Sequence, residues 1–445
     1  MERIFGTEGA RGMLIRCFDH ETAEKTGITA SAVLSSRTSE NPLITVGHDN
    51  GVSAENIADS VCTGICSAGI NAEKLGLVPS SAVSCLVRLH NADAGIMITS
   101  TPDNKYCGIR LYSGGGHKIS DEAWEEIEQL LFRTPDRIGK RLRDGKGGVI
   151  VCENALDEYI DFICKSADFS GLKVAVCCTD SRNTGIAVKA LYETGAEIFS
   201  IFENNETFDS DGYTKTTAEK LSDFVVEKNL DCGFVFGSDC ERCIAVDEKG
   251  NITDTDSLGA VFAEYYKENN LLRYDTFVAT SAVGTGFLEF AENSGISVIT
   301  GGRNERSVVA RMTEGGYNLG ADRHGRIIFY DDIPVGDGIF TAVRLLAVIK
   351  SRKRPLSEIS GKIRKYPQVM INVRISPEYK EIWKNDSVIT DIIEDYQRIM
   401  GKKGRITVRE NPKDSAVSVT AEGEDFTTAN NTAMEIARII RERTL

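Results

Sequence analysis

The sequence predicts an α/β protein of several domains, and three observations carry that prediction. Short apolar segments typical of buried strands alternate with amphipathic helical segments along most of the chain. Several apolar segments run directly into polar loops, and open α/β sheets hold their ligands at the carboxyl ends of their strands. A chain of 445 residues that is 41% hydrophobic is long enough to bury more than one core.

The first part of the chain begins with a glycine-rich stretch, residues 5–12, which contains Arg11. Such a stretch can fold closely over an anion, or it can be an ordinary turn. Residues 43–47 then read as a strand and residues 54–69 as a helix. This alternation predicts a mixed or parallel sheet with helices on both faces.

The next strand, residues 94–98, ends in the hydroxyl residues Ser100 and Thr101. This position suits a nucleophile or a phosphate contact. From this stretch alone, the favoured interpretation is a Ser/Thr-rich turn that caps the following element. Residues 121–132 then form an acidic amphipathic helix, which we expect to present a solvated face.

In the middle of the chain, strands at 174–178 and 230–236 flank a helix at 185–194. The second strand runs into a loop with two carboxylates, Asp239 and Glu241, before a short strand at 244–246. Carboxylates two residues apart can hold Mg²⁺, although a solvated turn has the same composition.

Strand–helix alternation continues with a helix at 258–268, a strand at 276–280 and a helix at 286–294. The loop that follows, residues 316–329, contains Asp322, His324 and Arg326. These side chains can grip sugar hydroxyls or a phosphate, or they can belong to a charged surface loop.

A strand at 365–374, helices at 388–399 and 429–442, and strands at 405–409 and 415–421 predict a small α+β unit at the end of the chain.

Composition excludes several classes of partner. A net charge of −14 and a pI near 5.1 argue against nucleic acid or an anionic membrane. The sequence lacks a membrane-span-length apolar run and a signal-peptide core, so we expect reduced cysteines and a cytoplasmic location. One Cys-x-x-Cys pair, Cys240 with Cys243, and five scattered histidines do not predict a zinc site.

The stretch from Gly95 to Arg110 resembles the phosphoserine loop of the α-D-phosphohexomutases. That loop reads Gly-Ile-Val-Ile-Ser-Ala-Ser-His-Asn-Pro, followed shortly by Asn-Gly-Ile-Lys. The resemblance implies a phosphoacceptor at Thr101, or at Ser100 if a one-residue deletion comes earlier. The family lysine, an acid or base, falls on Arg110, which is a poor proton shuttle.

Three further motifs of the family are similar but altered. The family opening Phe-Gly-Thr-Asp-Gly-Ile-Arg-Gly keeps its arginine as Arg11, whereas Gly51 replaces the arginine of Gly-x-Asp-x-Arg-x-Ser. The metal loop Asp-Gly-Asp-x-Asp-Arg retains Asp239 and Arg242, while Glu241 replaces its third aspartate. Because Gly237 replaces the first aspartate, we expect weak Mg²⁺ binding at most.

The family's sugar and phosphate loops are altered as well. Asp322, His324 and Arg326 replace the Glu, Ser and His of Leu-Gly-Gly-Glu-x-Ser-Gly-His-Ile. Of Arg-x-Ser-Gly-Thr-Glu-Pro-x-x-Arg, the first arginine remains as Arg409, and Lys413 compensates only partly for the lost anion-binding nest. The phrase at 365–374 resembles the phosphoglucosamine mutase branch in particular.

The resemblance implies three mixed-sheet α/β domains and a small α+β domain around a central cleft. We place them at residues 1–148, 149–254, 255–366 and 367–445. Because the reactive positions of the motifs are altered, we favour a pseudoenzyme that binds a hexose or hexosamine phosphate, or that acts as a regulatory or scaffolding partner. It would form a homodimer, or a heterodimer with an active mutase. The alternative is an active, diverged phosphohexomutase that uses Mg²⁺ and a Ser or Thr phosphoacceptor.

Overall fold

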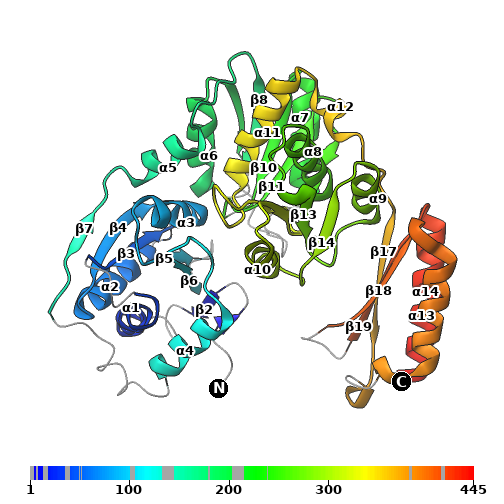
Figure 1. Cartoon of the computed structure of the whole chain (residues 1–445), viewed down its shortest axis with the longest axis horizontal. Coiled ribbons are helices and arrows are strands. Elements are labelled where there is room, and N and C mark those ends of the chain that lie inside the picture. Colours follow the sequence, from blue (N-terminus) through cyan, green and yellow to red (C-terminus); the bar gives the residue numbers. More distant parts are fainter. Residues whose placement is uncertain are drawn as a thin grey trace. The chain divides into compact units, whose positions relative to one another are not determined.

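The structure is a computed structural model (Figure 1). It describes residues 5–6, 9–13, 19–35, 41–49, 51, 53–100, 106–132, 145–178, 181–202, 215–237, 239–379, 383–411 and 416–444. The chain forms two compact units. The first contains Met1–Ala282 with Ser297–Ser360, and the second contains Val283–Ile296 with Gly361–Leu445.

The first sheet of the larger unit has seven strands in the order β1-β2-β6-β5-β3-β4-β7. Strands β5, β3, β4 and β7 run parallel to one another, and β6, β2 and β1 extend the sheet by antiparallel pairing. The strands are β1 (Phe5–Gly6), β2 (Gly9–Met13), β3 (Leu43–His48), β4 (Asn71–Leu77), β5 (Ala94–Ser100), β6 (Tyr106–Ser113) and β7 (Val149–Val151).

Four helices belong to this first sheet: α1 (His20–Leu34), α2 (Ala54–Ser67), α3 (Ser80–Leu89) and α4 (Asp121–Phe132). Helices α1 and α2 cross at two glycines. A Cβ atom on Gly27 would lie 2.3 Å from the carbonyl oxygen of Val61, and one on Gly64 would lie 2.0 Å from that of Glu24. Only glycine therefore permits this close approach of the two backbones.

The second sheet has five strands in the order β12-β11-β10-β8-β9, and the third has four in the order β14-β13-β15-β16. Their strands are β8 (Lys173–Cys178), β9 (Glu197–Phe202), β10 (Cys232–Phe236), β11 (Cys243–Asp247), β12 (Ile252–Thr253), β13 (Thr276–Ala279), β14 (Ser297–Thr300), β15 (Leu319–Ala321) and β16 (Ile327–Phe329). The accompanying helices are α5 (Ala155–Ile163), α6 (Ser181–Glu193), α7 (Lys215–Glu227), α8 (Thr255–Glu268), α10 (Glu305–Gly315), α11 (Gly338–Arg352) and α12 (Leu356–Ser360).

The smaller unit contains an antiparallel sheet in the order β17-β19-β18. Its elements are α9 (Thr285–Asn293), β17 (Gln368–Arg374), α13 (Ser387–Met400), β18 (Arg405–Asn411), β19 (Ala416–Glu422) and α14 (Phe426–Thr444). Alternate residues of β19, Val417, Val419 and Ala421, are fully buried in a core that includes Ile436 and Ile440 of α14. This period of two is what a half-buried strand requires.

The predicted α/β class is confirmed, with three sheets that mix parallel and antiparallel pairing and one antiparallel sheet. The four domain boundaries stay a prediction. Helix α4 has the predicted bounds and buries Trp124 and Ile127 on one face. Helix α10, which the sequence analysis did not predict, supplies a charged residue to the site below. None of the described helices is both long and apolar enough to cross a membrane.

Candidate functional site: a charge cluster and an oriented serine

Ser100 lies at the carboxyl end of β5, and the carboxylate of Asp49 orients it. Strands β3 and β5 run parallel, so residues that follow both strands meet at one edge of the sheet. The Ser100 hydroxyl donates to Asp49 Oδ1 at 2.9 Å, and the Ser100 backbone N–H donates to Asp49 Oδ2 at 2.6 Å. The serine oxygen therefore has a fixed position.

Gly51 makes this position of Ser100 sterically possible. A Cβ atom on Gly51 would lie 1.8 Å from Ser100 Oγ, and its backbone N–H donates to Asp49 Oδ1 at 3.0 Å. Any side chain at residue 51, including the arginine of the resembled motif, would displace the Ser100 side chain. The present position of Ser100 therefore depends on glycine, rather than the family's arginine, at residue 51.

Glu241 is the centre of a buried group of charges. Its side chain has no solvent exposure, and its two oxygens accept hydrogen bonds from three cationic side chains. Arg110 Nη1 donates to Oε1, while Lys118 Nζ and Arg326 Nε lie 3.3 and 3.0 Å from Oε2. Arg110 lies on β6, Lys118 lies beyond the turn after β6, and Arg326 precedes β16, so the first and third sheets both reach a loop of the second.

Four further residues complete what we call the charge cluster. Glu305, the first residue of α10, accepts from Lys118 Nζ at 2.5 Å and from the Gly336 backbone N–H at 2.7 Å. The cluster holds four basic and four acidic side chains and is balanced in charge. Its members are Arg110, Lys118, Arg242 and Arg326, with Asp239, Glu241, Glu305 and Asp322.

The pKa of Asp239 shows the effect of these cations. Burial alone would raise the pKa of this carboxyl, but the nearby guanidinium groups of Arg242, Arg110 and Arg326 outweigh burial and hold the pKa well below its usual range. Arg110 Nη2 lies 3.5 Å from Asp239 Oδ2, and Arg242 Nε lies 3.7 Å from Oδ1. Asp239 is therefore ionised across the physiological pH range.

The residues at the resembled metal loop do not fit Mg²⁺. Both oxygens of Glu241 already accept hydrogen bonds from cations, and Gly237 supplies no side-chain oxygen. Mg²⁺ requires near-ideal octahedral oxygen geometry with bonds of about 2.0–2.1 Å, which the Arg and Lys nitrogens would have to vacate. Among the described residues, neither Asp239 nor Glu241 belongs to a group of three possible metal ligands.

Of the three residues predicted to contact a sugar, Asp322 and Arg326 have buried side chains and His324 has an exposed one. Asp322 is buried and accepts from its own loop, from the His324 N–H at 2.7 Å and from Arg326 Nη1 at 3.0 Å. Arg326 points inward to Glu241, whereas His324 is exposed. Contact of these residues with a sugar stays a prediction, and in this conformation His324 is the one that faces solvent.

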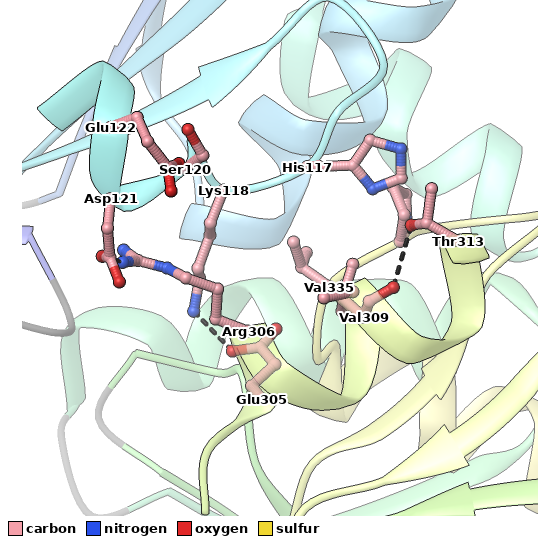
Figure 2. A pocket seen from close by; sticks show the side chains of 12 residues that line it. His117, Lys118, Ser120, Asp121, Glu122, Glu305, Arg306, Val309, Thr313 and Val335 are labelled. Atoms are coloured by element: carbon pink, nitrogen blue, oxygen red, sulfur yellow. Dashed lines mark hydrogen bonds and ion pairs between the residues drawn. The ribbon is translucent and has the colours of Figure 1, made fainter. Parts of the chain in front are cut away.

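A pocket of about 300 Å³ borders the charge cluster (Figure 2). Lys118 and Glu305 belong to both, and Figure 2 shows their ion pair at the pocket wall, with the Arg306–Asp121 pair beside it. Small and apolar residues of α10 and the loop before α11 form another part of the lining, and three polar residues near α4 complete it: Val309, Ala310, Thr313, Pro334 and Val335, with His117, Ser120 and Glu122. A ligand in this pocket would therefore contact the edge of the cluster directly.

The sequence analysis missed Asp49, Lys118 and Glu305. Asp49 could have been found, because it is the retained aspartate of the Gly-x-Asp-x-Arg-x-Ser motif. Lys118 and Glu305 lie outside every resembled motif and 187 residues apart, so only the fold brings them together.

The remaining predicted site residues lie elsewhere or are not described. Arg11 is on β2, where its backbone pairs with Gly108. Arg409 is on β18 of the smaller unit, half-buried and opposite Ser418. Thr101 and Lys413 lie outside the described residues.

Comparisons with known proteins agree with this architecture. Two family profiles match, those of phosphoglucomutase/phosphomannomutase alpha/beta/alpha domain I over residues 2–137 and domain III over residues 254–366. The phosphoglucosamine mutases of Acetivibrio thermocellus and Ruminiclostridium cellulolyticum are 34% and 33% identical to this chain, each over 100% of both chains.

Solved structures share the fold at lower identity. A phosphoglucomutase/phosphomannomutase family protein from Burkholderia thailandensis has a TM-score of 0.82 and 17% identity over 99% of this chain and 98% of its own. The N-acetylphosphoglucosamine mutase of Aspergillus fumigatus, solved with GlcNAc-6P and magnesium, has a TM-score of 0.59 and 11% identity over 99% of this chain and 96% of its own. This chain belongs to the phosphohexomutase superfamily, in its phosphoglucosamine mutase branch.

Proposed function

We propose that this protein is an active phosphosugar mutase that moves a phosphoryl group between two hydroxyls of a hexosamine phosphate, with Ser100 as its phosphoacceptor. The observation that carries the proposal is the hydrogen bond from Ser100 Oγ to Asp49, which orients one hydroxyl at the carboxyl end of a central strand. The full-length identity to phosphoglucosamine mutases supports hexosamine phosphate as the substrate class. This function replaces the pseudoenzyme that the altered motifs favoured.

In the proposed reaction, the bond between phosphorus and Ser100 Oγ breaks as a bond between phosphorus and a sugar hydroxyl oxygen forms. Over the step, the proton of the sugar hydroxyl passes to Ser100 Oγ, which leaves as a neutral hydroxyl, so atoms and charge balance. The reverse transfer, to the same serine from the other sugar position, completes the exchange. Asp49 holds the dephosphorylated serine in place between the two transfers.

We propose that the charge cluster stabilises the transferred group as a set of nearby fixed charges. Pairing of β5 with β6 sets Arg110 opposite Met97, three residues before Ser100, which corresponds to roughly 10 Å along the strand. Because this offset is odd, Arg110 and Ser100 project from opposite faces of the sheet, so Arg110 would act on the phosphoryl group through its charge rather than by direct contact. Phosphoryl transfer depends chiefly on positioning and on stabilisation of spread negative charge, which fixed guanidinium groups supply.

A second function, a non-catalytic sugar-phosphate-binding protein, is favoured by one specific observation. The carboxylates of the resembled metal loop are already paired with arginine and lysine, and a metal-dependent transfer would have no site there. Such a protein would bind hexose or hexosamine phosphates without turning them over. Homodimerisation, or pairing with an active mutase, is our prediction for either function, and sedimentation analysis would test it.

Intact mass combined with a coupled assay separates the two functions. The full chain is incubated with a hexose bisphosphate and then assayed with glucosamine, glucose and mannose phosphates, with and without Mg²⁺. We expect one added phosphoryl group that maps to Ser100, and turnover that Ser100→Ala abolishes while Thr101→Ala retains it. A phosphate that maps to Thr101 would show that the phosphoacceptor is Thr101 and not Ser100. Binding without phosphorylation or turnover would establish the non-catalytic function instead.

A further inference from the structure

A second group of polar side chains lies outside the charge cluster, around His90. His90 Nδ1 lies 2.6 Å from Glu73 Oε2, and His90 Nε2 lies 2.7 Å from Glu158 Oε2. The thiol of Cys152 completes the group, with its sulfur 3.9 Å from Glu158 Oε1. One ligand atom each from His90, Cys152 and Glu158 lies within 4.8 Å of the other two, which happens at no other group among the described residues.

Regular elements hold each of these side chains. His90 caps the carboxyl end of α3, and Glu158 lies in the first turn of α5. Glu73 is on β4, opposite Ile150 of β7, and the Cys152 backbone N–H continues that pairing by donating to the Lys74 carbonyl at 3.0 Å. A site built on strands and helix ends keeps its ligands closer to one geometry than a site built on loops does.

We propose that His90 Nε2, the Cys152 thiolate and a carboxylate oxygen of Glu158 bind a zinc-class divalent cation, with water at the fourth position. An imidazole, a thiolate and a carboxylate are the ligand types that zinc takes, and three protein ligands with an open fourth position form a recurrent zinc arrangement.

Glu73 has the position of the outer carboxylate in such a site. It accepts from His90 Nδ1, which fixes the tautomer that leaves Nε2 available for the metal. Charge also balances. Binding takes Cys152 as its thiolate and His90 through an unprotonated Nε2, so two negative groups, the Cys152 thiolate and the Glu158 carboxylate, would offset the two charges of the cation.

The site would join two parts of the larger unit. Glu73 and His90 belong to the body of the first sheet, whereas Cys152 and Glu158 belong to the segment of β7 and α5 that leads to the second sheet (Figure 1). The side chains are half-buried or buried, with 15% exposure for His90 and 12% for Glu73. A metal there would fasten α5 to α3 and stabilise the folded chain by mass action.

Cobalt titration of the full-length protein tests this proposal. After EDTA treatment and desalting, Co²⁺ is added while the thiolate-to-cobalt charge-transfer absorption is followed, and Zn²⁺ is then added as a competitor. We expect one Co²⁺ per chain with a charge-transfer band that Zn²⁺ removes. Cys152→Ser should abolish the band, whereas Cys66→Ser, the matched control at another half-buried cysteine, should retain it.

Glu73→Gln supplies a second, independent variant if Cys152→Ser folds poorly. It should weaken cobalt binding about 10- to 100-fold and retain the band at saturation, because Glu73 orients His90 without touching the metal. Absence of a charge-transfer band in the wild type, or a band that survives Cys152→Ser, would overturn the proposal. Circular dichroism checks that each variant is folded.

Discussion

Two regions of the larger unit hold carboxylates at strand ends, and they hold them differently. Among the residues that the structure describes, the donors to Asp49 are neutral: the Ser100 hydroxyl and the backbone N–H groups of Ser100 and Gly51. Glu241, in contrast, accepts hydrogen bonds from three cationic side chains and is fully buried. Neutral hydrogen bonds exchange at modest free energy, whereas a buried charge that loses its partners is strongly destabilised. The Asp49 region is thus suited to a reaction in which Ser100 exchanges a phosphoryl group. The Glu241 region is suited to holding the three sheets of the larger unit together.

The largest expected effect comes from neutralising the centre of the charge cluster. Glu241→Gln leaves Arg110, Lys118 and Arg326 around a neutral amide, and breaking a buried ion pair typically lowers the free energy of unfolding by about 3–5 kcal/mol. Urea denaturation of both variants measures this loss. Glu314→Gln, which breaks an exposed pair with Arg311, is the control and should leave the midpoint unchanged. Equal midpoints for the two variants would contradict a structural role of Glu241.

Asp337 combines one property of each region: it is buried, as Glu241 is, and its hydrogen-bond donors are neutral, as those of Asp49 are. It is the N-cap of α11 and accepts from Tyr159 Oη at 2.8 Å and from the Phe340 N–H at 2.9 Å. Burial raises its pKa to about 6, although these hydrogen bonds lower it in part.

The raised pKa of Asp337 gives stability a definite pH dependence. A carboxyl with a higher pKa in the folded state stabilises most below its usual pKa of 3.8, and loses that contribution as pH rises through about 6. We expect the free energy of unfolding to fall by roughly 2 kcal/mol between pH 4 and pH 7 from this group. Asp337→Asn should remove that slope, while Asp254→Asn, at the exposed N-cap of α8, should retain it in urea titrations at each pH.

The Asp49 region is expected to respond in activity more than in stability. Gly51→Ala places a methyl group where Ser100 Oγ now lies, so the serine must leave its bond to Asp49. A displacement of about 1 Å in a reacting group can lower the rate about 10²-fold. Coupled assays compare it with Gly185→Ala, a helical position on α6 at which a Cβ atom meets nothing within 4 Å. Unchanged turnover in Gly51→Ala would show that Ser100 is not the phosphoacceptor.

The smallest expected effect is that of Mg²⁺ on the wild type. Because cations already occupy the oxygens of Glu241, added Mg²⁺ should not shift the thermal midpoint. In Gly237→Asp the new Cβ lies 3.1 Å from Arg242 Nε and 3.2 Å from Asp239 Oδ1. The added carboxylate competes with Asp239 for Arg242 and supplies a further oxygen ligand, which should strengthen Mn²⁺ binding about tenfold or more. Electron paramagnetic resonance of free Mn²⁺ measures this, and tight Mn²⁺ binding by the wild type would show that the cluster opens for metal.

The sequence predicted the fold well because its signals are local. The all-apolar segment that became β8 and the amphipathic pattern of α4 each identify an element by themselves. The charge cluster could be predicted only in part. Asp239, Glu241, Asp322 and Arg326 lie in recognisable loops, but the inward direction of Asp322 and the approach of Lys118 to Glu305 depend on tertiary packing. The group around His90 has no sequence signal, since its three proposed ligands follow no regular spacing and lie at the end of α3, after β7 and on α5.

The contact between Gly51 and Ser100 also couples these two positions in any redesign of the loop. With 1.8 Å between a Cβ at residue 51 and Ser100 Oγ, an arginine at residue 51 fits only if the Ser100 side chain leaves its present rotamer. The same movement breaks the hydrogen bond from Ser100 Oγ to Asp49. A variant that restores the arginine of the family motif therefore changes two groups at once, and its effect cannot be assigned to the arginine alone.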